Sequence, residues 1–423
     1  MTMTSKIDRQ CFRRGTAGLL AAVLVLACSP QWTRAQALGT YITGESGSDR
    51  VIFRALFDTT VPNSGVVSIA AYETNTTGRL DNIDFTPGTG FAQVHVSQQR
   101  AGGGAITSYN VLTGAELPDY VPETSLGSFP PASGVSRPAS VLPTATHIYY
   151  VENQFGFAGG AHRIMRTPLA GPAGTTEVVF DGSSYPGGLT NFSGLEIVGA
   201  RMYTFVRDPT DPADTRALVS FGLSGAGIWD GMIPGPTGIV KNMTGLFEAL
   251  GPGVGPFASD GSDELTFDPV TGYLFGTNIA NGEVIAYDPV GGMAITSPGA
   301  AAGRFIDAGQ IDAGAATGLN LLDEMHRADG IRSTGTGHLV WVGHGGVLAA
   351  IDIAGVLADG ADDGDIIPLF FNPAFEFDDH ASLAPASAVD VAAVPEPSTL
   401  VIVGAGLLLL ARLARRRPSS SAR

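Results

Sequence analysis

The sequence predicts an all-β protein, a β-propeller of six blades, with seven as the alternative count. Three observations predict it. No long stretch between residues 38 and 390 keeps the 3.6-residue apolar period of a helix. The 423 residues include 57 glycines and 27 prolines, which favour many turns and short strands. A phrase of three short strands recurs along the chain, as in propeller blades. A large β-sandwich or a β-helix is the alternative architecture.

The clearest copy of the phrase is "DELTFDPVTGYLFGTNIANGEVIAYDPVGG" (Asp263–Gly292). "ELTFD" and "YLFGTN" alternate between apolar and polar residues, and "PVTG" between them has Pro and Gly at turn positions. Asn281-Gly282 is a hairpin signal before a third strand, "EVIAYD". This copy therefore predicts one blade.

Other copies of the phrase give the remaining blades. They lie at 80–114, 140–171, 193–227 and 328–355, and 41–58 supplies a partial first unit. Their spacing is irregular, and the extra residues are loops rich in Gly, Pro and Ser. After the last copy, Asp359–Asp379 is expected to close the ring.

The N-terminal segment has the features of a secretory signal. Basic residues up to Arg14 precede the apolar run Gly18–Ala27, and the small residues of Ala35–Ala37 offer a cleavage site. We expect residues 1–37 to be this signal and Sec translocase to be the export partner. "VLAC", which ends at Cys28, is a loose lipobox, so lipid attachment at Cys28 is the alternative. Both cysteines of the chain lie in this segment, and the exported domain therefore uses no disulfide.

The exported domain is strongly acidic. Ten of the 24 Lys and Arg residues, but one of the 40 Asp and Glu residues, lie in 1–37 and 398–423. The remaining chain carries 14 basic and 39 acidic groups, a net charge of −25. Such a field repels nucleic acid and attracts divalent cations. The composition therefore excludes a nucleic-acid-binding function.

The C-terminus carries a three-part motif. Its parts are a tripeptide (Pro395, Glu396, Pro397), an apolar run (Leu400–Leu410) and a basic cluster (Arg415, Arg416, Arg417). The run is shorter than the about 20 residues of a permanent transmembrane helix. The segment closely resembles the PEP-CTERM sorting signal of Gram-negative bacteria. That resemblance implies recognition by an exosortase, cleavage near the tripeptide, transient association with the inner membrane through 400–414, and delivery to the cell surface or extracellular matrix.

These segments divide the chain into four parts. They are a signal peptide (1–37), the propeller-like domain (38–390), a linker with the tripeptide (391–397), and the apolar helix with its basic tail (398–423).

Two sets of acidic residues are candidate metal ligands. The blade phrases resemble those of secreted six-bladed propellers, including the gluconolactonase/senescence-marker family, in which a Glu, an Asn and an Asp hold a divalent metal. Glu264 and Asp329 match the Glu and the Asp of that family. The family's Glu comes earlier in its chain, and no matching Asn is present here. The run "DGADDGDII" offers Asp359, Asp363 and Asp365 to Ca²⁺ or another divalent cation, without the spacing of an EF-hand.

The sequence carries no Gly-x-Ser-x-Gly elbow, P-loop or dinucleotide fingerprint. We therefore predict an exported, non-catalytic surface or matrix protein whose propeller is a binding scaffold for exopolysaccharide or surface proteins. An extracellular hydrolase or lactonase with a divalent metal in the propeller channel is the alternative. A structural matrix protein without a discrete ligand is the third possibility.

Overall fold

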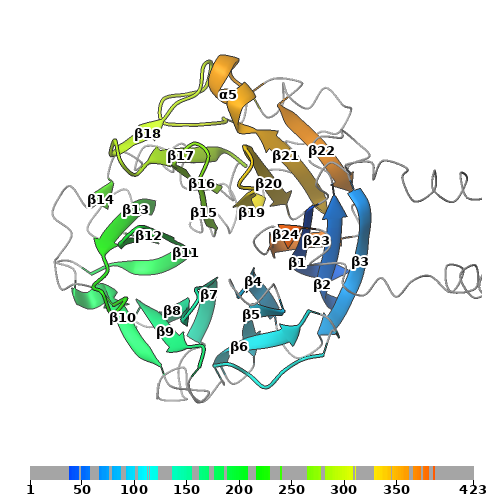
Figure 1. Ribbon diagram of the computed structural model, residues 1–423, viewed down its shortest axis with the longest axis vertical. Coiled ribbons are helices and arrows are strands. Elements are labelled where there is room, and N and C mark those ends of the chain that lie inside the picture. The colour runs from blue at the N-terminus through cyan, green and yellow to red at the C-terminus, as the bar shows by residue number, and fades with distance from the viewer. Residues whose placement is uncertain are drawn as a thin grey trace, which may run out of the picture. The chain divides into compact units, whose positions relative to one another are not determined.

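The computed structural model describes most of the chain between Leu38 and Pro385 (Figure 1). The described residues are 38–46, 49–57, 66–75, 79–86, 92–100, 103–111, 113, 115–121, 136–154, 162–170, 176–184, 188–207, 216–228, 239–240, 264–277, 282–307, 310, 328–343, 345–361, 365–372, 375–380 and 384–385. Residues 1–37 form a separate unit, so the fold concerns the unit Leu38–Arg423 alone.

The strands of the described residues form six antiparallel sheets. The first sheet contains β1 (Leu38–Ser46), β2 (Asp49–Phe57) and β3 (Val66–Asn75), with β23 (Phe375–His380) and β24 (Ala384–Pro385), and the second contains β4 (Arg79–Phe85), β5 (Gln93–Arg100) and β6 (Gly103–Asn110). The third contains β7 (Ser136–Pro143), β8 (His147–Gln154), β9 (His162–Pro168) and β10 (Glu177–Asp181), and the fourth contains β11 (Thr190–Val198), β12 (Arg201–Arg207), β13 (Arg216–Gly222) and β14 (Ile239–Val240). The fifth contains β15 (Leu265–Asp268), β16 (Tyr273–Thr277), β17 (Val284–Asp288) and β18 (Met293–Ile295), and the sixth contains β19 (Ala328–Ser333), β20 (His338–Gly343), β21 (Val347–Asp352) and β22 (Ile366–Phe371).

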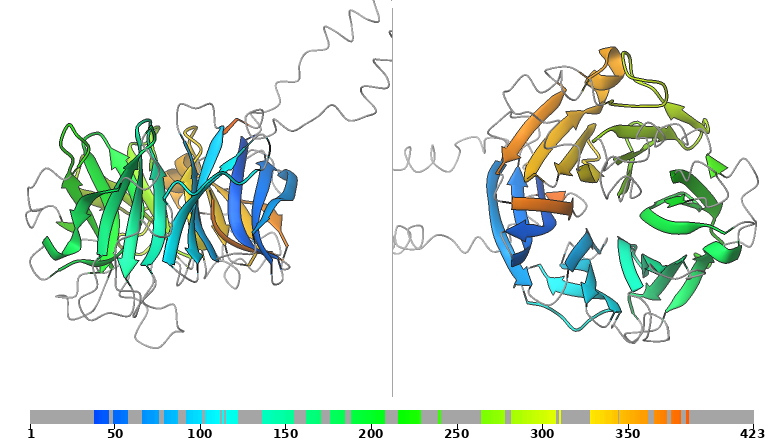
Figure 2. Two further views of the ribbon diagram at one scale, coloured as in Figure 1. Left: turned by 90° about the horizontal axis from the view of Figure 1, so that it is seen from below. Right: turned by 180° about the vertical axis from the view of Figure 1, so that it is seen from behind.

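These sheets are arranged around a central axis as the blades of a β-propeller, which confirms the predicted fold class (Figures 1 and 2). The innermost strands are β23, β4, β7, β11, β15 and β19, and each contacts the next one around the ring. The expected units beginning at 80, 140, 193, 263 and 328 all start within two residues of, or inside, one of these strands. The repeat in the sequence is therefore the blade.

An apolar cluster lies between each pair of neighbouring sheets. Phe275, Val284 and Trp341 belong to the cluster between the sheets of β15–β18 and β19–β22. Five further clusters join the other neighbours in the same way. Both faces of a blade are buried in this arrangement, which explains why the strands are apolar in continuous runs.

The turn between β15 and β16 follows from its sequence. The Asp268 carboxylate accepts hydrogen bonds from the backbone N–H and the hydroxyl of Thr271, both at 2.8 Å. Gly272 then adopts a φ of +76°, a conformation that residues with a side chain rarely take. The predicted "PVTG" turn is thus confirmed as the connection between two strands.

The ring closes with strands from both ends of the unit. In the first sheet the order is β23-β1-β2-β3, so a strand near the C-terminus is innermost and the N-terminal strands complete the blade. The expectation that Asp359–Asp379 closes the ring is right for its last part. Its earlier residues form the end of a helix and β22, which is the outer strand of the preceding sheet.

One helix was not expected from the sequence. Helix α5 (Ile353–Asp359) follows β21 directly, where the sequence analysis extended the blade phrase to Gly355. The Asp352 carboxylate accepts a hydrogen bond from the N–H of Ala354 at 3.0 Å and caps the helix. Gly360, with a φ of +94°, ends it.

Candidate functional site

The inner strands carry polar side chains toward the axis of the ring. Each of these strands has one edge without a neighbouring strand in its own sheet, so its backbone N–H groups need other acceptors. Side chains from the preceding blade provide them in four places. The acceptors are Asn82 for the N–H of Val141 (2.9 Å), Ser140 for Gly194 (2.8 Å), Glu196 for Phe267 (3.0 Å) and Glu264 for Ile331 (2.5 Å).

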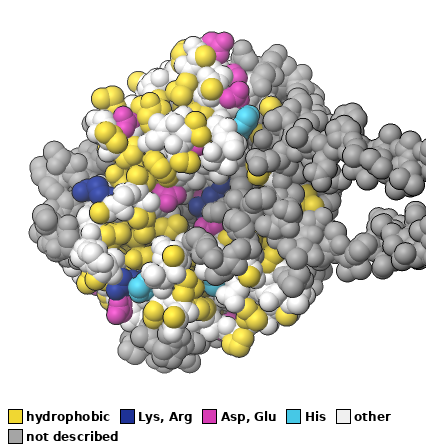
Figure 3. All heavy atoms as spheres, viewed as in Figure 1, with side chains coloured by type: hydrophobic (Ala, Val, Ile, Leu, Met, Phe, Trp, Pro, Cys, Tyr) yellow, Lys and Arg dark blue, Asp and Glu magenta, His cyan; other side chains and the backbone are white. Residues whose placement is uncertain are grey.

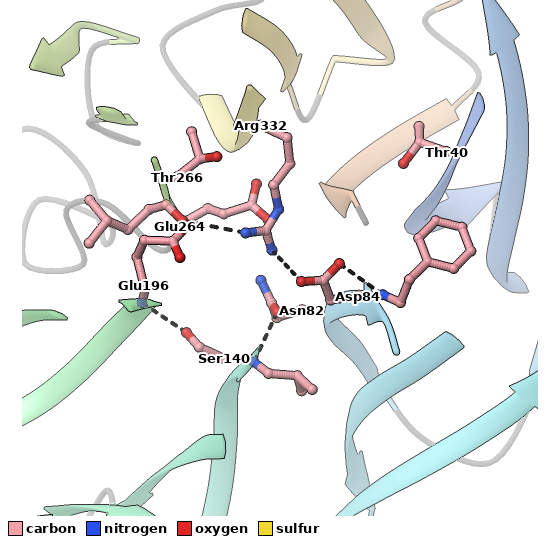
Figure 4. Close-up of polar contacts among 12 residues, drawn as sticks. Thr40, Asn82, Asp84, Ser140, Glu196, Glu264, Thr266 and Arg332 are labelled. Carbon is pink, nitrogen blue, oxygen red and sulfur yellow. Dashed lines mark hydrogen bonds and ion pairs between the residues drawn. The ribbon is translucent and has the colours of Figure 1, made fainter. Parts of the chain in front are cut away.

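Arg332 on β19 lies at the centre of this polar set (Figure 4). Its Nη2 is 2.5 Å from Oε1 of Glu264 and 3.9 Å from Oδ2 of Asp84, and its Nη1 donates to the carbonyl of Leu265 at 3.3 Å. Glu264 directly precedes β15, whereas Asp84 lies on β4. One guanidinium therefore links three inner strands that are far apart in the sequence.

The set is almost fully removed from solvent. The exposed fractions are 0% for Glu264, 3% for Asp84 and 4% for Arg332. Glu196 is half-buried. In the space-filling view, acidic and basic side chains gather near the middle of the face (Figure 3). A buried charge is stable only when it is paired, and the contacts of Arg332 supply that pairing.

The environment favours protonated glutamates. Burial raises the pKa of Glu264 to about 8, and Arg332 and the hydrogen bonds from Ile331 and Asn82 oppose this rise. Burial also raises the pKa of Glu196 to about 7, again against the effect of Arg332. Asp84 adds to both shifts because a second carboxylate nearby disfavours ionisation.

The arrangement is suited to holding blades together. Glu196 and Glu264 each use one carboxylate oxygen to accept a backbone N–H of the next blade. The other oxygen of Glu264 contacts Arg332. A general acid or base must reach the proton it transfers, and Glu264 has no exposed surface.

The first predicted metal site is described in part. Glu264 belongs to the polar set, whereas Asp329 lies in β19 with a side chain outside the described residues. Among the residues that the structure describes, no group of three or more His, Cys, Asp or Glu side chains is arranged to hold a metal. A site at Glu264 and Asp329 remains a prediction.

The second predicted metal site is also described in part. Asp359 is the exposed last residue of α5. Asp365 is buried, and its Oδ1 is 1.8 Å from the place that a Cβ on Gly355 would occupy, so its carboxylate packs directly against the helix. Asp363 lies outside the described residues. Calcium binding by this loop likewise remains a prediction.

Sequence reasoning missed most of the polar set. Asn82, Asp84, Glu196 and Arg332 were not singled out. A signal was available, because "LDNIDF" and "GIRS" place charged or amide side chains inside short strands of an apolar repeat. Such a residue must find a partner in the folded protein, although the sequence does not say which one.

The residues of the C-terminal motif, Pro395–Pro397 and Arg415–Arg417, lie outside the described residues. In the part of the chain that is described, no helix is long and apolar enough to span a membrane.

Comparison with known proteins identifies one segment and supports the fold. Residues 393–417 match the family model of the PEP-CTERM protein-sorting motif. No curated protein matches the sequence. A nidogen/laminin complex structure is similar at 13% identity and a TM-score of 0.50, covering 82% of this chain and 98% of that chain. At this identity the similarity supports the fold alone.

Two further solved structures resemble the chain with TM-scores below 0.5. One is from Bacteroides fragilis NCTC 9343 and is provisionally assigned as a 6-phosphogluconolactonase; it is 13% identical, with a TM-score of 0.43, and the match covers 81% of this chain and 83% of that one. The other is TolB from Acinetobacter baumannii, which is 10% identical with a TM-score of 0.44. That match covers 85% of this chain and 69% of the TolB chain. Neither carries an argument about function.

Proposed function

We propose that this chain, a PEP-CTERM protein whose sorting motif spans residues 393–417, is a non-catalytic propeller scaffold at the cell surface or in the extracellular matrix of a Gram-negative bacterium. The motif indicates an exported protein that an exosortase processes. The propeller is the part that remains outside the cell after processing. Exopolysaccharide and other surface proteins are the partners that fit this location.

One observation carries the non-catalytic part of the proposal. The carboxylates of the polar set are engaged in joining blades: Glu196 and Glu264 accept backbone N–H groups, and Asp84 and Glu264 face Arg332. Catalytic carboxylates need a position from which they can reach a substrate or a metal. The engagement of these groups with the fold supports a structural role for the polar set around Arg332.

The strong acidity supports a location rich in divalent cations and polysaccharide. A net charge of −25 on the exported part keeps the protein soluble and discourages binding to anionic polymers unless cations bridge them. Neutral or cation-bridged polysaccharide is therefore the class of ligand that the charge allows.

Replacement of the tripeptide tests the sorting part. The full chain with Pro395→Ala, Glu396→Ala and Pro397→Ala should keep its C-terminal segment and stay in the membrane fraction of a host that contains an exosortase. A Pro418→Ala chain is the matched control, because Pro418 follows the basic cluster. It should be shortened and found at the cell surface like the unchanged chain. Equal processing of the tripeptide variant would contradict the proposal.

Metal and activity measurements test the non-catalytic part. The domain 38–393 should contain no divalent metal that depends on Glu264 and should not hydrolyse lactones. The contrary result would be a bound metal or a lactone hydrolysis that Glu264→Gln removes and that Asp359→Asn, on the exposed end of α5, leaves intact. That outcome would support the alternative function, an extracellular metal-dependent lactonase.

A further inference from the structure

The second blade has fewer strands than the others. Among the described residues its sheet contains three strands, β4, β5 and β6, whereas every other sheet contains four or five (Figure 1). Residues 115–121, which we call the strap, lie along the outer edge of β6 in the place of a fourth strand. The strap pairs with β6 at two isolated antiparallel bridges, Ile106 with Val121 and Tyr109 with Glu116.

Backbone hydrogen bonds hold the strap on β6. The N–H of Leu117 donates to the carbonyl of Ser108 at 2.8 Å. The N–H of Tyr120 donates to the carbonyl of Ile106, also at 2.8 Å. The N–H of Ile106 in turn donates to the carbonyl of Val121 at 3.0 Å. The strap therefore covers backbone groups of β6 that an uncovered edge strand would present to another extended chain.

A buried imidazole lies next to the strap. His95 on β5 has no exposed surface. Its Nδ1 is 2.7 Å from Oγ of Ser108, and its Nε2 contacts Oγ1 of Thr86. A neutral imidazole suits these two hydroxyls, because one ring nitrogen donates, the other accepts, and a hydroxyl does either. The surroundings of His95 are therefore built for its neutral form.

Two contacts connect this imidazole with the strap. Ser108 contacts His95 through its hydroxyl and accepts the N–H of Leu117 through its carbonyl. The ring of Tyr120 stands edge-on to the ring of His95, with the centroids 5.5 Å apart. The hydroxyl of Tyr120 also donates to the carbonyl of Pro168 in the third blade. A change of charge on His95 therefore acts on the strap at both Leu117 and Tyr120.

No carboxylate among the described residues forms an ion pair with His95. On the strap and on the strands packed against β5, the ionisable side chains that the structure describes are Asp81, Asp84, Tyr109, Glu116, Asp119 and Tyr120. Those of Arg79, Arg100 and Arg137 lie outside the described residues. Asp84 faces Arg332, and Asp119 accepts the hydroxyl of Thr107 at 3.1 Å. Burial lowers the pKa of His95 to about 4.

We propose that the strap is an acid-released cover of β6: in acid His95 takes up a proton, and residues 115–121 leave the outer edge of that strand. A buried imidazolium without a counter-charge is costly, and displacement of Ser108 and Tyr120 gives it access to water. Because the pKa of His95 is lowered in the closed form, the open form binds the proton more tightly. The closed strap is therefore most stable above about pH 6.5 and loses stability as the pH falls toward about 4.

Amide hydrogen exchange of the full chain, followed by mass spectrometry at about pH 7 and about pH 4 and corrected for the intrinsic effect of pH, tests the proposal. Protection of residues 115–121 should fall at least about tenfold, because each pKa unit between 6.5 and about 4 is a factor of ten in the opening equilibrium. Residues 338–352 of the sixth blade should keep their protection. Protection of the strap that changes by less than about twofold, or an equal fall in both regions, would overturn the proposal.

Replacement of the imidazole should remove the effect. His95→Gln has no titrating group, and its amide can still donate to one hydroxyl and accept from the other. Its strap should stay protected at about pH 4. His147→Gln is the matched control, because His147 on β8 is half-buried and contacts the hydroxyl of Thr146 at 2.9 Å. Its strap should be released in acid as in the unchanged chain.

A second variant and a second measurement cover the other causes. Release that persists in His95→Gln and is abolished by Asp119→Asn would assign the effect to the strap's own carboxylate and contradict the proposal. If His95→Gln does not fold, exchange of the C2 hydrogen of His95 in the unchanged chain reports its protonation. Protonation should appear only at pH values where the strap has already lost protection. A protonated His95 under a strap that is still fully protected would equally refute the proposal.

Discussion

Nη2 of Arg332 lies 2.5 Å from Oε1 of Glu264, and both side chains are at least 95% buried. The pair joins β19 to the residue that precedes β15, and the same guanidinium faces Asp84 on β4. Removal of the guanidinium leaves two carboxylates buried without it.

Arg332→Met should therefore be strongly destabilising. Loss of one partner of a buried ion pair costs about 3–5 kcal/mol. Adding Glu264→Gln to Arg332→Met should recover part of this loss, about 1 kcal/mol or more, because a neutral amide can still accept the N–H of Ile331. Urea unfolding of the domain 38–393 above pH 8, where Glu264 is ionised, measures both. Strictly additive effects of the two substitutions would show that the pair is not coupled.

Stability should fall as the pH rises because of Glu264. Its pKa is raised from 4.5 to about 8 in the folded protein, so the folded state binds this proton more tightly than the unfolded state. The stabilisation that this proton gives the folded state is fully present below about pH 4.5 and is lost as the pH rises through about 8. Glu264→Gln should reduce the fall in the free energy of unfolding with pH, which urea unfolding at a series of pH values measures.

A charge-matched control separates this effect from general repulsion. Asp359→Asn removes one negative charge from an exposed site at the end of α5. Between pH 5 and 8, the free energy of unfolding of this variant should change with pH as it does in the unchanged domain. Equal flattening by both substitutions would mean that net charge, rather than the buried carboxyl, causes the pH dependence.

Gly346→Ala should destabilise the connection that leads to the closing strand. A Cβ at Gly346 would lie 2.1 Å from the carbonyl oxygen of Asn372, and the φ of Gly346 is +71°. Gly272 has a φ of +76° with nothing within 4 Å of its Cβ position, so Gly272→Ala carries the backbone strain alone. We expect Gly272→Ala to lower the free energy of unfolding by about 1–2 kcal/mol and Gly346→Ala to lower it by more. Thermal or urea unfolding measures both. Equal losses would mean that the close contact with Asn372 is relieved without cost.

Phe377→Ala should weaken ring closure more than Phe375→Ala. Phe377 is fully buried in the closing interface, whereas Phe375 on the same strand is half-buried. Truncation of a buried Phe costs about 3–5 kcal/mol, and the half-buried ring should cost less. The emission of Trp341, which is fully buried, follows unfolding. A larger loss for Phe375→Ala would contradict the assignment of Phe377 as the anchor of β23.

Much of the propeller could be predicted from the chain itself. The phrase at Asp263–Gly292 contains β15, β16 and β17 in the expected order, because alternation, the Pro-Gly turn and Asn281-Gly282 are local signals. Helix α5 was missed although its cap is also local: Asp352 and Gly360 stand at its two ends. The apolar strand before it favoured a continued blade, and seven residues are too few to show a clear helical period.

The candidate site could be predicted only in part. Glu264 was singled out as a metal ligand, which stays a prediction, and the structure also pairs it with Arg332 from the next blade. Residues 84, 264 and 332 are up to 248 positions apart, and no spacing rule joins them. Their proximity follows from the ring, which places every inner strand beside the same axis.

The sequence by itself determined the class of fold, the repeat of the blade and the C-terminal sorting motif, because periodicity, turn residues and a contiguous motif are all encoded over short stretches. Only the tertiary structure decided that β23 joins β1 and that one arginine contacts two carboxylates near the axis of the ring. Both depend on closure of the ring, which brings the first and last strands together and removes the inner side chains from water.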